Sequence, residues 1–497
     1  MYGETAAADG KAAFEGYLGG DFPLDQPGTG ARVSTETSPF GVDLAVRYPH
    51  AGTGELVSAA SAALPAWRDA GPQARVGVCL EILDRLHKHI FELANAVQFT
   101  SGQAFVMAFQ AGGAHALDRA LEALAYAYAE MTRHPGTAGW EKAAGKGDPL
   151  RMTKTFHVVP RGVALVIGCN TFPTWNSYPG LFASLVTGNP VIVKPHPRAV
   201  LPLAITVKYA REVLAEADFD PNLIMLAAEA PGEKLASDLA LHQAVRIVDF
   251  TGSTEYGDWL ETHARQASVY TEKAGLNTVV IDSTDDFAGM CRNLGFTLTL
   301  YSGQMCTTSQ NILIRPGHRD RPGAQELRRG GRRDRRRGRQ AHRGPGPGRG
   351  ADRCHRQRRG AGAAGRGDQG RRAGVESRTV THPSYADAVV RTPTIVKLAA
   401  DDAETYGREW FGPISFAIAT DSTAHSLELL RRTVGEKGAL TAGVYSTDEA
   451  VLDETESVAV EVGCTCPATS PAASSSTSRR RSPTSTAAGP TRRPTRR

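Results

Sequence analysis

The sequence predicts an α/β protein whose first half holds a doubly wound parallel sheet and whose second half holds another α/β domain. Continuous apolar runs at Val163–Ile167 and Val191–Val193 are typical of strands buried on both faces. Helix-length segments such as 201–217 separate consecutive strands, so the strands are expected to run parallel. A length of 497 residues is enough for two or more domains.

Residues 55–132, ahead of this sheet, are expected to form helices. Apolar side chains recur there at helical spacing, in the series Leu56, Ala59, Ala60, Ala63 and Trp67. This pattern suits amphipathic core helices of any fold, so it does not decide between folds. Residues 134–160 are polar and contain glycine before they become extended.

The carboxyl edge of the predicted parallel sheet is expected to bind a nucleotide. Further strands are expected at 223–226 and 245–250, and the second leads into Thr251-Gly252-Ser253. Ser253 precedes a helix, where its hydroxyl could cap the first turn beside a pyrophosphate or serve as a plain N-cap. No GxGxxG fingerprint is present in this part of the sequence.

Cys306 stands between the pair Gly303-Gln304 and a polar run that ends at Asn311. The preceding residues 295–300 are apolar enough to be buried, which would hold the cysteine in a fixed place. A thiolate attacks a carbonyl carbon far better than water does, so a positioned cysteine indicates covalent catalysis on an aldehyde or acyl group. The alternative is a buried structural thiol, because free cysteine is among the most buried residue types.

Glu272 lies upstream of this cysteine, in the segment 271–277 that leads into the expected strand 278–281. A thioester on Cys306 would need a base to activate the hydrolytic water, and Glu272 could be that base. The alternative is a solvated loop carboxylate.

Together, the Glu272 segment and Gly303-Gln304-Met305-Cys306 resemble the aldehyde dehydrogenase superfamily, whose usual forms are E-L-G-G-K and G-Q-x-C. The resemblance implies an aldehyde dehydrogenase-like fold and an enzyme that oxidises an aldehyde to a carboxylic acid through a cysteine thioester. It also implies a division into an NAD(P)-binding domain at 1–135 and 157–271, an oligomerisation hairpin at 136–156, and a catalytic domain at 272–315 and 375–462.

The resemblance also assigns residues to a nicotinamide dinucleotide. Lys194 ends a predicted strand, where its ammonium can reach a ribose hydroxyl or a phosphate; the alternative is a solvent-facing lysine. Thr251, Gly252 and Ser253 would lie beside the pyrophosphate. The run Glu409-Trp410-Phe411-Gly412-Pro413 is similar to the family's E-I-F-G-P, in which the glutamate holds the nicotinamide ribose and the phenylalanine packs near the ring.

A first departure from the family pattern concerns the oxyanion. The family asparagine usually stands in N-F-P, whereas this chain has Asn170-Thr171-Phe172-Pro173. Strict alignment places Thr171 at that position. A side-chain amide would hold a developing oxyanion together with the backbone N–H of Cys306, so Asn170 is favoured.

A second departure is Lys194-Pro195-His196-Pro197-Arg198, in which Pro197 stands where members that prefer NAD often have glutamate. An acid there would bind the ribose 2′-hydroxyl and repel a 2′-phosphate. Its absence, with Arg198 adjacent, favours NADP as the cofactor, and NAD is the alternative.

The run FPTWNSYPGLFASLVTGNPVIVKPHP, together with TEKAGLNTVVID and YSGQMCTTSQN, looks most like the PaaN branch of the superfamily, which acts in phenylacetic acid degradation. That branch implies a small-molecule aldehyde as substrate, the ring-opened semialdehyde of phenylacetate catabolism attached to coenzyme A. No residue shows a coenzyme A site. The alternative among enzymes is an acylating dehydrogenase that passes the thioester to coenzyme A.

The segments 316–374 and 463–497 lack the composition of a folded core. Residues 315–372 hold 20 arginines against 5 acidic residues, and residues 463–497 hold 7 arginines and no acid, which predicts disorder. We interpret both as products of frameshifts that would impair this chain, so a family-like homodimer or tetramer is expected only from a frame-restored chain. The alternative is an inactive or binding protein with a basic arm for nucleic acid.

The cysteine pattern and the absence of targeting segments predict a cytoplasmic protein. Seven cysteines show no regular framework and no CxxC pair, which fits a reducing compartment and argues against structural zinc. No signal peptide is visible, and no apolar stretch reaches the ~20 residues that a membrane helix needs. We therefore expect no metal site, no membrane association and no nucleic-acid partner.

Overall fold

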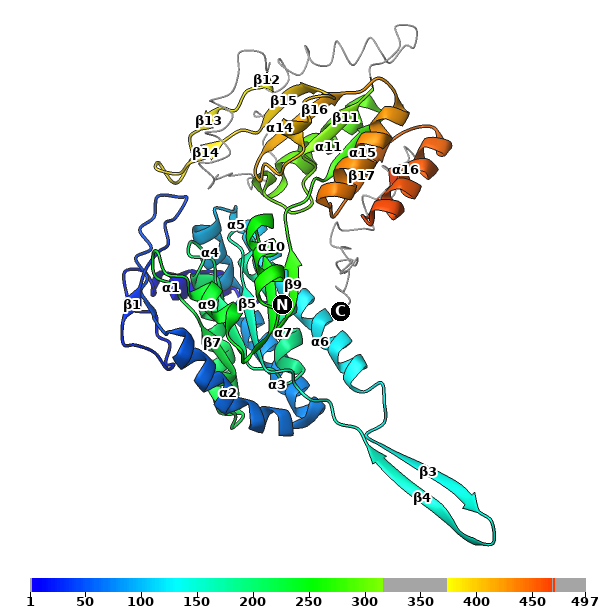
Figure 1. The fold of residues 1–497 in the computed structure, drawn as a ribbon. Coiled ribbons are helices and arrows are strands. Elements are labelled where there is room, and N and C mark those ends of the chain that lie inside the picture. Colours follow the sequence, from blue (N-terminus) through cyan, green and yellow to red (C-terminus); the bar gives the residue numbers. More distant parts are fainter. Residues whose placement is uncertain (1, 316–372, 467, 470–497) are drawn as a thin grey trace. The chain divides into compact units, whose positions relative to one another are not determined.

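The computed structural model describes residues 2–315, 373–466 and 468–469, which divide into two compact units, Met1–Lys273 and Ala274–Arg497 (Figure 1). Each unit is an α/β structure, as the sequence predicts. Most of the two arginine-rich segments, namely 316–372 and 470–497, lies outside the described residues. Throughout the described ranges, no helix has both the length and the apolar character needed to cross a membrane.

The first unit is built on a parallel sheet with strand order β7-β6-β5-β8-β9. Its members are β5 (Val163–Ile167), β6 (Val191–Lys194), β7 (Ile224–Leu226), β8 (Val245–Thr251) and β9 (Ser268–Glu272). Because β5 pairs with both β6 and β8, the order reverses there, which confirms the predicted doubly wound arrangement.

Helices cover both faces of this sheet (Figure 1). On one face, α2 (Thr53–Asp69) and α9 (Leu235–Leu241) share a buried cluster with alternate β5 residues, including Leu165. The intervening β5 residues are also buried and face the other side, where α7 (Pro173–Val186) and α8 (Leu201–Glu216) contact the strands. Burial on both faces explains why these strands are continuously apolar.

The residues before the sheet are helical, as their periodicity predicts. Further elements of this unit are α1 (Ala6–Glu15), α3 (Gly71–Lys88), α4 (Ile90–Ser101), α5 (Phe105–Met107), the π-helix η1 (Ala108–Ala114), α6 (His115–Met131), η2 (Pro221–Leu223), α10 (Thr254–His263) and the paired strands β1 (Arg32–Val33) and β2 (Tyr48–Pro49). Buried Trp67 and Arg75 tie α2 and α3 to α7 by donating to the carbonyls of Leu185 and Val186, at 2.8 and 2.9 Å.

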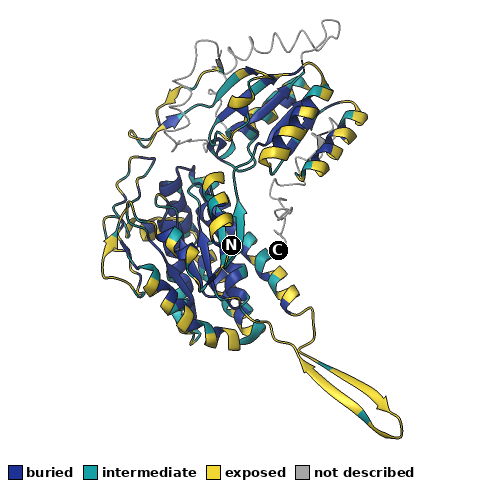
Figure 2. Cartoon of the chain, in the orientation of Figure 1, coloured by how far each residue is buried: buried dark blue, intermediate teal, exposed yellow. Residues whose placement is uncertain are grey.

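An antiparallel hairpin extends from the first unit (Figure 1). It consists of β3 (Thr137–Ala144) and β4 (Gly147–Thr155), with Trp140 opposite Met152. Almost every residue is exposed, including both of these side chains (Figure 2). The polar, glycine-containing stretch noted in the sequence is therefore a ribbon without a core of its own.

The second unit is built on a sheet with strand order β12-β15-β16-β11-β10-β17-β18, in which β12 alone runs antiparallel to its described neighbour. The strands are β10 (Thr278–Ile281), β11 (Asn311–Ile314), β12 (Ala373–Val375), β15 (Thr394–Ala399), β16 (Ile414–Ala419), β17 (Ala442–Tyr445) and β18 (Ala468–Thr469). A separate pair, β13 (Thr379–Val380) and β14 (Val390–Arg391), is antiparallel.

The two faces of this second sheet bury different helices. Val279 and Ile281 of β10 pack in a cluster with α11 (Phe287–Thr299), whereas Val280 packs in a cluster with α15 (Thr423–Lys437) and α16 (Glu449–Val462). The alternation follows from the two-residue period of a strand. Two short helices complete the described elements, η3 (Leu300–Gly303) and α14 (Ala403–Tyr406).

The predicted boundaries of the disordered segments need correction at both inner margins. Residues 373–375 form β12, and residues 463–466 continue the fold after α16. Gly463 ends α16 in the left-handed conformation, with φ of 73°. The backbone N–H of Thr465 donates to the carbonyl of Leu440, and its carbonyl accepts from the N–H of Ala442 at the start of β17. Cys464 and Cys466 pack against the α15–α16 cluster, so the composition change does not mark the end of the fold.

Candidate active site

Cys306 follows a turn of the second unit that holds three successive residues in the left-handed region. Tyr301, Ser302 and Gly303 have φ of 48°, 60° and 66°. A Cβ on Gly303 would lie 2.7 Å from the Cα of Pro413, so only glycine lets the turn pack this closely. The left-handed conformation costs a non-glycine residue about 1–2 kcal/mol, and such strain clusters at functional sites.

Asn277 fixes the segment that carries the cysteine. Its side chain is buried, and its Nδ2 donates to the carbonyl of Cys306 at 2.6 Å. Its Oδ1 accepts from the backbone N–H groups of Leu440 and Thr441, both at 3.0 Å. One amide thus joins the cysteine loop to the segment before β17, and both partners are backbone groups that a mutation of Cys306 leaves in place.

The expected burial of residues 295–300 is wrong for most of that stretch. The residues form the end of α11 and the start of η3, and Leu298 is buried, but Phe296 is 61% exposed. Cys306 itself is partly buried and forms no disulfide. The turn and Asn277 fix the cysteine, whereas the preceding apolar residues contribute little.

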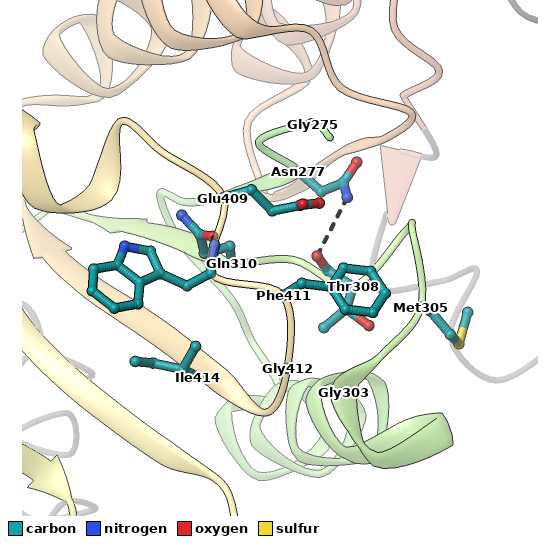
Figure 3. A pocket seen from close by; sticks show the side chains of 11 residues that line it. Gly275, Asn277, Gly303, Met305, Thr308, Gln310, Glu409, Phe411, Gly412 and Ile414 are labelled. Carbon is teal, nitrogen blue, oxygen red and sulfur yellow. Dashed lines mark hydrogen bonds between the residues drawn. The ribbon is translucent and has the colours of Figure 1, made fainter. Parts of the chain in front are cut away.

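A pocket lies beside this loop within the second unit (Figure 3). Asn277, Gly303 and Met305 line one part of it, and Glu409 and Phe411 enter from the loop before β16. The carboxylate of Glu409 extends toward Asn277 (Figure 3). The structure therefore brings the predicted cofactor residues Glu409 and Phe411 to the same pocket as the residues that flank Cys306.

The side chain of Gln310 forms hydrogen bonds with backbone groups before and after Glu409. Its buried Nε2 donates to the carbonyls of Tyr406 and Arg408, at 3.2 and 3.0 Å. Its Oε1 accepts from the backbone N–H of Trp410 at 2.6 Å. Because these contacts lie on both sides of residue 409, Gln310, directly before β11, sets the orientation of the Glu409 backbone.

Burial raises the pKa of Glu409 to about 7, although a hydrogen bond from the backbone of Gly275 opposes the rise. The residue keeps a large exposed surface, so water screens part of this effect. The carboxyl group therefore changes charge close to neutral pH. Among the described residues, no three His, Cys, Asp or Glu side chains group closely enough to hold a metal ion.

The raised pKa predicts a pH-dependent stability. The free energy of unfolding should fall as pH rises from the ordinary value of 4.5 through about 7, because folded Glu409 binds its proton more tightly than the unfolded chain does. Glu409→Gln should flatten this slope, whereas Glu404→Gln on the exposed face of α14 should not. Urea unfolding between pH 4 and pH 8 measures the slopes, and equal slopes in the two variants would contradict the prediction.

Glu272 ends β9 in the first unit, where it is half-buried. Its Oε2 accepts from Nδ2 of Asn176 on α7 at 3.2 Å, and Oδ1 of Asn176 accepts from Sγ of Cys169 at 3.5 Å. Burial raises the pKa of Cys169 to about 11, and the charge of Glu272 adds to the rise, so Cys169 remains a protonated donor. Glu272 is thus a held carboxylate and not the solvated one of the alternative interpretation.

The two candidates for the oxyanion position differ in exposure. Thr171 is 7% exposed, and its carbonyl accepts from Nε2 of buried Gln103. Asn170 is only partly buried. Since a group that stabilises substrate must be reachable, the difference favours Asn170 over Thr171, in the direction that the sequence analysis chose.

The predicted dinucleotide residues of the first unit gather at the carboxyl edge of its sheet. Lys194 ends β6 and is 5% exposed, which excludes the solvent-facing alternative. Ser253 caps α10 by accepting from the backbone N–H of Tyr256 at 3.3 Å, and Gly252 donates to the carbonyl of Glu272 at 3.0 Å. Arg198 is exposed. An ammonium, a helix cap and close-packed glycine backbone fit a dinucleotide with its ribose hydroxyls and phosphates.

Comparison with known proteins decides the family. The model of the aldehyde dehydrogenase family matches residues 45–474. The chain belongs to this family.

Solved aldehyde dehydrogenases share the fold. The crystal structure of an NAD-dependent aldehyde dehydrogenase from Burkholderia multivorans is 49% identical, with a TM-score of 0.86 over 94% of this chain and 84% of that one. A 1-pyrroline-5-carboxylate dehydrogenase from Thermus, solved with bound NAD, is 20% identical with a TM-score of 0.69, over 91% and 85% of the two chains.

Curated aldehyde dehydrogenases match over shorter ranges. An α-ketoglutarate semialdehyde dehydrogenase from Haloferax volcanii is 26% identical over 60% of this chain and 59% of its own length. A family 7 member A1 homologue from Caenorhabditis elegans is 30% identical over 31% of this chain and 29% of its own. The chain thus spans no more than about 60% of the curated relatives' lengths in these alignments.

Several residues that shape the site could not be identified from the sequence. Asn277, Gln310, Asn176 and Gln103 all act through hydrogen bonds to distant segments. Asn277 and Asn176 were part of the quoted motifs, but nothing in the sequence showed which groups they contact. A polar residue directly before an apolar strand, such as Gln310 before β11, is the sequence signal that could have indicated these contacts.

Proposed function

We propose that this family member is an NAD(P)-dependent aldehyde dehydrogenase that oxidises an aldehyde to a carboxylic acid through a thioester on Cys306. The observation that carries the proposal is the Asn277 amide, which fixes the Cys306 backbone beside a pocket that also holds Glu409 and Phe411. The NAD-dependent relative at 49% identity supports the same reaction class.

The proposed chemistry begins when Sγ of Cys306 attacks the carbonyl carbon and the thiol proton passes to a base. The oxyanion accepts hydrogen bonds from the Cys306 backbone N–H and from the side-chain amide of Asn170. A bound nicotinamide supplies the hydride acceptor for the oxidation. In the second half, Glu272 takes a proton from water, the resulting hydroxide attacks the thioester carbon, and the C–S bond breaks to return the Cys306 thiolate.

We propose that different residues bind different parts of the dinucleotide. Lys194 would bind a ribose hydroxyl or phosphate, Thr251 to Ser253 the pyrophosphate, Glu409 the nicotinamide ribose, and Phe411 the region of the ring. The prediction of NADP from Pro197 and Arg198 remains a proposal. The relative from Burkholderia multivorans is NAD-dependent and the one from Thermus was solved with bound NAD, which favours the alternative cofactor for those proteins.

We propose a ring-opened semialdehyde of phenylacetate catabolism, linked to coenzyme A, as substrate, with PaaN-type activity. The similarity of the segment Phe172–Pro197 to the PaaN branch supports this choice. Relatives are named for other aldehydes, such as α-ketoglutarate semialdehyde, so the test is a panel that compares these aldehydes by kcat/KM on the full chain. Formation of reduced dinucleotide only when free coenzyme A is present would instead favour the acylating alternative.

We propose that the hairpin 136–156 mediates self-association once the reading frame is restored. Trp140 and Met152 are 47% and 49% exposed on opposed strand positions, and exposed apolar pairs of this kind are typical of interfaces. Replacing both by serine should shift the frame-restored chain from a dimer or tetramer to a monomer in size-exclusion chromatography with light scattering. Lys142→Ser on the same hairpin is the control, and an unshifted double variant would exclude the hairpin as the contact.

A further inference from the structure

Glu229 forms an ion pair with Lys194 at the carboxyl edge of the first sheet. The strands β6 and β7 are parallel neighbours, with Val193 opposite Leu226, so the residues that follow them lie side by side. Nζ of Lys194 is 2.5 Å from Oε2 of Glu229, and the two side chains are 7% and 13% exposed. Glu229 belongs to none of the sequence motifs described above.

The other oxygen of Glu229 is also held by the protein. Oε1 accepts from the backbone N–H of Ala236 at 3.3 Å, so the carboxylate has a defined orientation. Residue 197 cannot substitute for it: Pro197 has no side-chain acceptor, and its carbonyl accepts from the hydroxyl of Thr35. The acid that is missing after Lys194 in the sequence is therefore supplied by the loop that follows the neighbouring strand β7.

The ion pair changes which dinucleotide Lys194 favours. A lysine alone at the end of β6 would favour the added negative charge of a 2′-phosphate, but pairing with Glu229 cancels its charge. An acid at the end of a strand in a doubly wound sheet accepts a hydrogen bond from a ribose 2′-hydroxyl and opposes a 2′-phosphate. The side chain of Arg198 is exposed, so it offers no comparable buried charge.

We infer that Glu229 is a specificity-determining residue that gives this chain a preference for NAD over NADP. The inference rests on the proposed function, since it requires a nicotinamide dinucleotide at this edge. The inferred preference for NAD is opposite to the preference for NADP that Pro197 and Arg198 suggest. The reason is that the acid is Glu229, which lies 32 residues after Pro197 in the chain.

The test is isothermal titration calorimetry of the full 497-residue chain with NAD and with NADP. The unmodified chain should bind NAD at least about tenfold more tightly, since a like-charge contact of about 1.4 kcal/mol already gives that ratio. Glu229→Gln keeps a hydrogen-bond acceptor but removes the charge, and should raise NADP affinity about tenfold relative to NAD. Glu229→Asp keeps the charge and should keep the preference for NAD.

Glu233→Gln is the matched control. It removes a carboxylate of the same loop that contacts His50 at 3.1 Å and not Lys194, so the NAD to NADP ratio should stay unchanged. Circular dichroism melting confirms that each variant is folded, and the ratio of the unmodified chain tests the inference without any variant.

The outcomes separate the two proposals. Preference of the unmodified chain for NADP, or an unchanged ratio in folded Glu229→Gln, would overturn the inference while the dehydrogenase proposal stands. Binding of neither dinucleotide by the unmodified chain would overturn the proposed function and the inference with it.

Discussion

Cys306→Ala should lower aldehyde oxidation by at least about 10³-fold, because loss of a catalytic nucleophile removes the covalent route entirely. The substitution removes only Sγ. The hydrogen bond from Asn277 reaches the backbone carbonyl of residue 306, and the left-handed turn at 301–303 precedes it, so both survive the change. The effect should therefore fall on kcat, with dinucleotide affinity nearly unchanged.

The measurement is formation of reduced dinucleotide at 340 nm, together with intact-mass detection of an aldehyde-derived adduct on the unmodified chain. Cys291→Ala is the matched control, because Cys291 is another partly buried cysteine of the second unit, lies on α11 and packs against the cluster that holds Val279 and Ile281. It should keep activity within about twofold, as expected for a substitution away from the reacting atoms. Comparable activity of the two variants would show that Cys306 is a structural thiol.

The parallel sheet of the first unit could be predicted because its strands are buried on both faces. The run Val163–Ile167 is apolar throughout for that reason, and strands and helix-length segments alternate regularly along the sequence. The position of Lys194 at the end of β6 follows directly from the same pattern. These features depend on residues that are close in the sequence, which is why they could be read from it.

The surroundings of Cys306 could not be predicted in the same way. Asn277 contacts residues 306 and 440–441, and Gln310 contacts residues 406–410, so each links segments far apart in the sequence. In the same way, nothing in the sequence showed that Lys194 forms an ion pair with Glu229, which lies in the loop after β7. Hydrogen bonds between distant segments leave no periodic trace in a single sequence.

The margins of the arginine-rich segments show a related limit. Composition separates segments that can build a core from those that cannot, but it does not show which single residues at a margin still pack on the core. Cys464 and Cys466 pack on the α15–α16 cluster although the sequence around them already resembles the tail. A boundary drawn from composition therefore ended the fold too early.

Glu272→Gln should leave the first half of the proposed reaction intact and slow the second half by about 10²–10⁴-fold, the usual contribution of a general base. Glutamine is nearly isosteric with glutamate, and its amide oxygen can still accept from Asn176, so the side chain should stay in place. An amide cannot take a proton from water. The thioester on Cys306 should therefore accumulate, and one equivalent of reduced dinucleotide should form rapidly before turnover stalls.

Intact mass spectrometry after rapid mixing with aldehyde and dinucleotide detects the trapped acyl group, and peptide mapping locates it on Cys306. Glu261→Gln is the control: Glu261 is a carboxylate of the adjacent helix α10 that binds Lys273 and the hydroxyl of Thr271, and its loss should not trap the acyl group. Normal deacylation in Glu272→Gln would place the base elsewhere in the chain. A third outcome is that free coenzyme A releases the acyl group and water does not, both in the unmodified chain and in the variant. That result would identify coenzyme A as the natural acceptor and make Glu272 unnecessary for turnover.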